Sequence, residues 1–326
     1  MWGNWLGWGI SAVLLAVAGG GFYNLAVPPP ESPPAHLIPE DLMRNLSLPE
    51  GTDKIMPPGK REGDGGSLYL QAMLLYQGNP APYNDPIHAA PKDLPSIDFL
   101  RQAADFRRMN LFEARPEKVI NYNNELPELE ALIKIADAAN TMGLGAKLDG
   151  KYDNAKQLFS AVFALGRHLF DERVSWREMS AGIIMMSNAS RNLAEVADDE
   201  KEGARAAVLR HLREELDKYR SELQDKIGSP LTNPVESYAG KYSGDIFAIA
   251  RDTSVERVWR VQAILHLGRY KWNVADGHRG DQVWGHRVLK SLKTSIDPAN
   301  GDNVIQTAID AAMNLTLDQQ RKSIAM

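Results

Sequence analysis

The chain has 326 residues, of which 44% are hydrophobic and 24% are charged, so its composition is that of a folded protein. Its net charge of −5 argues against a general nucleic-acid-binding protein, because phosphate contacts require an excess of basic residues. The sequence contains no cysteine, which excludes disulfides, thiolate zinc sites, iron–sulfur clusters and a cysteine nucleophile.

The N-terminal residues 1–27 are predicted to form a membrane anchor. Residues 6–27 are almost uninterruptedly apolar, and about 20 helical residues cross the hydrocarbon core of a bilayer. Small residues recur every four positions in this run, and such a row lets another helix approach closely. These candidate partner-binding residues are Ala12, Ala16 and Gly20. The alternative is a cleaved signal peptide, although no basic residue precedes the apolar run.

The flanking charges indicate an orientation for this anchor. No Lys or Arg precedes it, and the first basic residue after it is Arg44. Because basic residues are retained in the cytoplasm, their absence favours export of the C-terminal part. We therefore expect a single-pass protein of a bacterial inner membrane, with a cytoplasmic N-terminus, a periplasmic body and lipid contacts through residues 6–27.

Residues 28–66 are predicted to form an extended arm or linker that is rich in proline and glycine. Proline fixes the backbone angle φ and removes an amide donor, so this composition opposes helix and sheet. The segment is a spacer or an arm that lies on a partner. The apolar side chains of this segment favour an arm over a spacer. They are Leu37, Ile38, Leu42, Leu46 and Leu48.

Residues 67–326 are predicted to be an all-α body. No proline occurs between Pro127 and Pro230, and apolar residues recur at helical spacing from Leu129 onward. Capping boxes are expected at residues 175–178 and 253–256. The predicted helices span 67–76, 96–114, 116–123, 126–147, 152–169, 175–197, 199–226, 234–251, 254–273, 281–294 and a segment after Asp302.

One pair of these helices has a distinctive pattern of small and large residues. The pattern runs from Met142-Gly143 through Gly150-Lys151-Tyr152 to Ala155, Phe159 and Val162. Over residues 136–169 it resembles a unit of the tetratricopeptide (TPR) family, although Ala139 and Arg167 stand where the family has Trp and Pro. The resemblance implies a stack of antiparallel helix pairs that acts as a non-catalytic protein-binding scaffold with a concave surface.

A second candidate surface lies between Arg251 and Lys293. This stretch has nine basic and four acidic residues, in a chain that is acidic overall. Arginine and tryptophan are frequent anchors of protein interfaces, but the aromatic rings could instead be core residues. The predicted partner-binding residues are Trp259, Arg260, Tyr270, Trp272 and Trp284.

Two sets of residues carry possible site chemistry. Asp276, His278, Asp281 and His286 could hold a divalent metal ion, or could form a polar loop in which Asp281 caps a helix. His168 and Glu172, four positions apart on one helix, are expected to form an exposed ion pair or hydrogen bond.

Together these features predict a non-catalytic accessory or scaffold subunit, without a cofactor, that docks on and stabilises a larger membrane protein complex. An energy-transducing complex is one possible host. The alternatives are a free TPR-type adaptor for peptides or envelope proteins, with an open groove lined by Asn, Lys or Arg, and a metal-dependent enzyme that uses the 276–286 cluster. Nucleic acid is not an expected partner.

Overall fold

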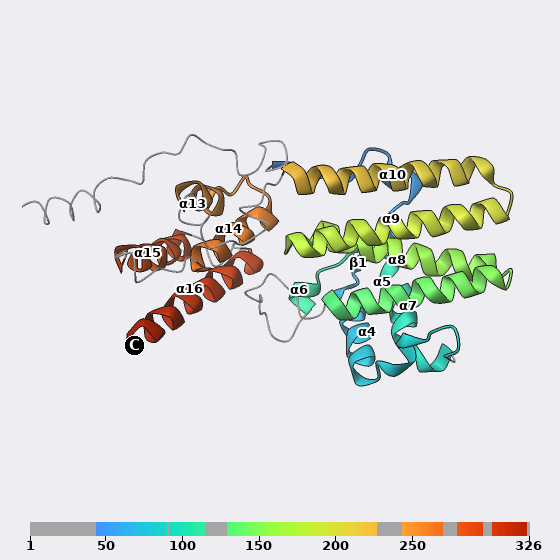
Figure 1. The fold of residues 1–326 in the computed structure, drawn as a ribbon, viewed down its shortest axis with the longest axis horizontal. Coiled ribbons are helices and arrows are strands. Elements are labelled where there is room, and N and C mark those ends of the chain that lie inside the picture. Colours follow the sequence, from blue (N-terminus) through green and yellow to red (C-terminus); the bar gives the residue numbers. More distant parts are fainter. Residues whose placement is uncertain are drawn as a thin grey trace, which may run out of the picture.

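The computed structural model describes residues 44–89, 91–114, 129–226, 243–269, 279–295 and 302–324 (Figure 1). The predicted anchor and residues 28–43 of the predicted arm lie outside this part of the chain. Among the described residues, no helix combines the length and the apolar character that a membrane crossing requires.

The described chain is almost entirely helical, as the sequence predicted, with one short pair of strands. The N-terminal part contains α3 (Thr52–Ile55), β1 (Arg61–Asp64), α4 (Gly66–Gly78), α5 (Pro95–Ala104), β2 (Phe106–Arg108) and α6 (Leu111–Ala114). Four long helices follow, namely α7 (Leu129–Leu148), α8 (Tyr152–Glu172), α9 (Trp176–Asp199) and α10 (Gly203–Lys226). The C-terminal part contains α13 (Ser243–Arg251), α14 (Arg257–Arg269), α15 (Arg279–Ser295) and α16 (Asn303–Ile324).

The helices α7 to α10 lie side by side as successive antiparallel neighbours (Figure 1). Glycines permit the closest approaches between them. A Cβ atom at Gly143 of α7 would lie 2.5 Å from the ring of Phe159 in α8, and one at Gly182 of α9 would lie 2.3 Å from the carbonyl oxygen of Gly166 in α8. Gly150, with φ of 72°, turns the chain between α7 and α8.

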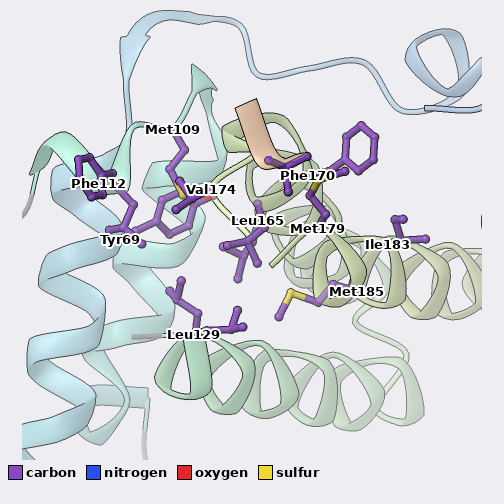
Figure 2. Close-up of a cluster of buried hydrophobic side chains, with 14 of the residues drawn as sticks. Tyr69, Met109, Phe112, Leu129, Leu165, Phe170, Val174, Met179, Ile183 and Met185 are labelled. Atoms are coloured by element: carbon purple, nitrogen blue, oxygen red, sulfur yellow. The ribbon is translucent and has the colours of Figure 1, made fainter. Parts of the chain in front are cut away.

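The main core fills the space where α4 meets the long helices. Figure 2 shows Tyr69 of α4, Leu129 of α7, Leu165 of α8 and Met185 of α9 around one shared interior. Tyr69 and Leu165 are completely buried, so the N-terminal helix α4 and the long helix α8 share this apolar core.

The single helix predicted over residues 96–114 is wrong. The helix α5 ends at Ala104, and β2 follows and pairs in parallel with β1. The Arg61 amide donates to the carbonyl of Asp105 over 2.8 Å, and the Asp64 carboxylate accepts from the Asn110 amide over 2.7 Å. These contacts draw the backbone out of the helix, and strands of three and four residues are too short to produce a visible alternation.

The two predicted capping boxes have different outcomes. At α9 the box is confirmed, because the Glu178 amide donates to the Ser175 hydroxyl over 3.1 Å and the Glu178 carboxylate accepts from the Ser175 amide over 3.0 Å. The box predicted at 253–256 is wrong, because α14 begins only at Arg257. The Glu256 carboxylate there accepts from the Leu46 amide and from Arg173 instead.

The helices α13 to α16 form a second group beside the first (Figure 1). Trp259 of α14 is completely buried and its ring stacks on that of Trp176 in α9, with centroids 6.2 Å apart. Of the two interpretations that the sequence left open for Trp259, a partner contact or a core residue, its burial favours the core residue. Its indole is a core residue that joins the two groups of helices.

Candidate partner-binding trough

Residues 44–60 contact both α8 and α10, and we call them the strap. Their N-terminal end is fixed at the junction of the two helix groups. The Arg173 guanidinium donates to the Leu46 carbonyl and lies 2.5 Å from the Glu256 carboxylate. Leu46 itself is buried, and Arg44 lies 3.3 Å from the carboxylate of Asp252. This part of the predicted arm thus packs on the chain's own body.

The C-terminal end of the strap is held by Arg167 of α8. Its guanidinium donates to the Met56 carbonyl and lies 3.1 Å from the Asp53 carboxylate, although the side chain is only 5% exposed. Burial lowers the pKa of Arg167, and the charge of Asp53 opposes that shift. A guanidinium stays protonated under such conditions, so Arg167 is a buried permanent cation.

An open trough with a volume of about 950 Å³ lies beside this end of the strap. We call it the basic trough. It is bounded by strap residues from Ile55 onward, by α5, by α8 and by Arg205 at the start of α10. Two acidic side chains line it, Asp98 and Asp105. Six basic side chains line it, and these are Lys60, Arg61, Arg101, Lys156, Arg167 and Arg205.

Some of these cations are already neutralised. Lys156 lies 2.9 Å from the carboxylates of both Asp153 and Glu200, and these contacts raise its pKa. Arg205 lies 3.2 Å from the Glu202 carboxylate.

The remaining cations, Arg101, Arg61 and Lys60, have weaker contacts with carboxylates or none among the described residues. Arg101 donates to the Gln157 amide oxygen and lies 4.0 Å from the largely exposed Asp98 carboxylate. Arg61 stands 4.6 Å above the Phe106 ring. Within the part of the chain that the structure describes, no carboxylate pairs with Lys60 or Arg61. The trough therefore keeps cations that are available to an anionic ligand.

His168 lies at the buried end of the trough and does not form the expected exposed pair with Glu172. Both residues are buried. The Nδ1 atom of His168 lies 2.9 Å from the Tyr69 hydroxyl, and the Nε2 atom lies 3.0 Å from the Phe106 carbonyl. A carbonyl can only accept, so Nε2 carries the proton and Tyr69 donates to Nδ1. Glu172 accepts from the Phe112 amide over 2.7 Å.

This arrangement predicts acid sensitivity. Burial lowers the pKa of His168 from 6.5 to about 4, so the unfolded state binds more protons between these pH values. We expect the free energy of unfolding to fall by up to about 3 kcal/mol as the pH drops from 6.5 to 4. Urea denaturation at a series of pH values measures it. His168→Gln should flatten this dependence, whereas His211→Gln, at an exposed position, should leave it unchanged. An identical slope in His168→Gln and the wild type would contradict the assignment.

Of the predicted partner-binding residues between Arg251 and Lys293, the structure describes the side chains of Trp259 and Arg260. Trp259 is in the core, and the half-buried Arg260 donates to the Ala250 carbonyl. Tyr270 and Trp272 lie outside the described residues, as do Ala12, Ala16 and Gly20. Trp284 lies on α15, but its side chain is outside the description.

The proposed metal cluster stays a prediction. Asp276 and His278 lie outside the described residues, and only the backbone of Asp281 and His286 is described, in α15. Among the side chains that the structure does describe, no group of three or more possible metal ligands occurs.

Sequence reasoning missed both the strap and the basic trough. The basic residues of the trough come from four separate segments of the chain, so the sequence contains no local run of charge that would predict the trough. In the sequence, Arg167 is conspicuous only as a departure from the repeat pattern. Comparison with known proteins adds nothing to this assignment, since no family model, no curated protein and no solved structure gives a significant match.

Proposed function

We propose that this protein is a non-catalytic, membrane-anchored scaffold that docks on and stabilises a larger membrane protein complex. The observation that carries the proposal is the attachment of the strap to the body. Arg173 and Arg167 hold the backbone carbonyls of Leu46 and Met56, at opposite ends of the strap. The C-terminal part of the predicted arm is thus fixed at a defined position on the body.

This attachment shortens the tether between the predicted anchor and the body. The predicted arm comprises residues 28–66, but only residues 28–43 precede the strap. A segment of that length spans at most about 55 Å when fully extended. A short tether keeps the body close to the membrane and raises its effective concentration for a partner in the same membrane. A docking subunit benefits from this more than a freely diffusing adaptor does.

The packing of α7 on α8 supports a TPR-like character for the body. Gly143 packs on Phe159, and Ala155 is completely buried, as a close-packed pair requires. We propose that the body extends this pairing as a stack of antiparallel helices with α9 and α10. The second candidate function, a free adaptor for peptides, is favoured by the basic trough, which is open and lined by Lys and Arg.

Extraction of native membranes in a mild detergent tests the scaffold proposal. We expect the full-length protein to elute as a large particle of fixed stoichiometry, with partner subunits identified by mass spectrometry. Lipid contacts through residues 6–27 would keep it membrane-bound until detergent is added, and nuclease treatment should leave the particle intact. A monomer that retains its N-terminus would contradict the scaffold function and favour the free adaptor.

A further inference from the structure

We propose that the basic trough binds an extended acidic peptide segment of a partner protein. The inference rests on the proposed scaffold function, because it assigns the face through which the body docks and the chemistry of the partner.

The charge of the trough selects an anion. Lys60 and Arg61 have no carboxylate partner among the described residues, and Arg101 has one only at 4.0 Å. The Asp98 carboxylate in that contact is 71% exposed, so water screens the pair and leaves Arg101 available. An incoming carboxylate can form charge-assisted hydrogen bonds with either guanidinium, and Arg–carboxylate pairs are often bidentate.

The floor of the trough has room for a peptide backbone. Three residues of α8 that line its centre are small, namely Ser160, Ala161 and Ala164, and the larger Phe163 among them is almost fully buried. The Gln102 side chain also lines the trough, and its amide can both donate to and accept from a peptide group. A floor of small residues with polar groups next to it can accommodate a peptide main chain better than it can accommodate a bulky apolar side chain.

The length of the trough favours a peptide over a small anion. Its lining extends along α8 from Lys156 to His168, which corresponds to about 18 Å of helix. About five extended residues cover that length. The available cations lie toward both ends. Arg101 donates to Gln157, next to Lys156, and Arg61 stands over the ring of Phe106, whose carbonyl accepts from His168. One carboxylate or phosphate cannot reach both ends, whereas a peptide with several acidic side chains can.

The test measures peptide binding by the full chain in phosphatidylcholine nanodiscs. The probe is a short fluorescein-labelled peptide of alternating Asp and Glu, with an Asn and Gln peptide of equal length for comparison. We expect saturable anisotropy changes with the acidic peptide only, and weaker binding as salt is added. The double variant Arg61→Glu with Arg101→Glu should weaken binding by at least about tenfold.

The matched control is Lys218→Glu on α10, which reverses the charge of one basic residue as each trough substitution does. Lys218 is 66% exposed and does not line the trough, so this variant should bind the acidic peptide as the wild type does. Unchanged helicity by circular dichroism would show that each variant is folded. Equal binding by the trough variant and the wild type, or equal binding of both peptides, would overturn the inference. So would displacement of the peptide when the measurement is repeated in nanodiscs that also contain phosphatidylserine, an anionic lipid.

The outcomes separate this inference from the scaffold function. Peptide binding without a co-purifying complex would support the basic trough and reject the scaffold. A stable complex that forms equally well with the Arg61→Glu and Arg101→Glu variant would support the scaffold and reject the trough as its docking face.

Discussion

Replacement of Gly182 by alanine is expected to lower the free energy of unfolding by about 3 kcal/mol, because the added methyl group has no space between α8 and α9. The new Cβ atom would lie 2.3 Å from the carbonyl oxygen of Gly166. In the same way, a Cβ atom at Gly166 would lie 2.5 Å from the carbonyl oxygen of Gly182. The backbone atoms of two packed helices cannot relieve such a clash by rotating away, as a flexible side chain can. The helices must separate, which loosens the core that Leu165 and Met185 share (Figure 2). Urea denaturation followed by circular dichroism measures the loss.

Gly203 provides the control for this substitution. It begins α10, and a Cβ atom there would meet no heavy atom within 4 Å. Gly203→Ala should therefore leave stability unchanged or raise it by less than about 1 kcal/mol, through the better helix propensity of alanine. If Gly182→Ala were as mild as this control, the close contact of α8 with α9 would be wrong.

Replacement of Arg173 by methionine is expected to lower the free energy of unfolding by about 2 kcal/mol, because it removes one partner from a partly buried ion pair. The side chains of Arg173 and Glu256 are only 26% and 17% exposed. The variant leaves the Glu256 carboxylate without its cation and the Leu46 carbonyl without its donor. The strap should detach locally, which hydrogen–deuterium exchange of residues 44–56 would report as faster exchange.

Two further variants separate the ion pair from a general effect. Glu256→Gln together with Arg173→Met should recover part of the lost stability, because no charge is then left uncompensated. Arg191→Met, at an exposed position on α9, should change stability by less than about 0.5 kcal/mol. If the strap exchanged hydrogen for deuterium equally fast in Arg173→Met and in the wild type, Arg173 would not be the residue that holds the strap on the body.

The sequence allowed most helices to be located, because each has its own local signals. The period of apolar residues placed α7 and α8 to within a few residues, and the Ser175 capping box marked the start of α9. The same local approach failed where a distant contact competes with a local one. Glu256 has the spacing of a capping residue, but Arg173 and the Leu46 amide recruit its carboxylate from elsewhere in the chain.

The site was harder to predict than the helices for the same reason. Trp259 lies in a stretch rich in arginine, which is typical of an interface, yet helix packing buries it on Trp176. Arg101 and Lys156 carry no pattern that connects them, and only the packing of α5 against α8 brings both to one trough. Periodicity reveals which face of a helix is apolar, but it does not reveal which helix that face will meet.

Photo-cross-linking in native membranes tests the central claim most directly. A photoreactive amino acid at Gln102, in the basic trough, is compared with one at Lys218, outside it. We predict that position 102 alone captures an acidic segment of one subunit that also co-purifies with the protein at fixed stoichiometry. Capture of lipid only, or the same products from both positions, would contradict a scaffold that docks through its basic trough.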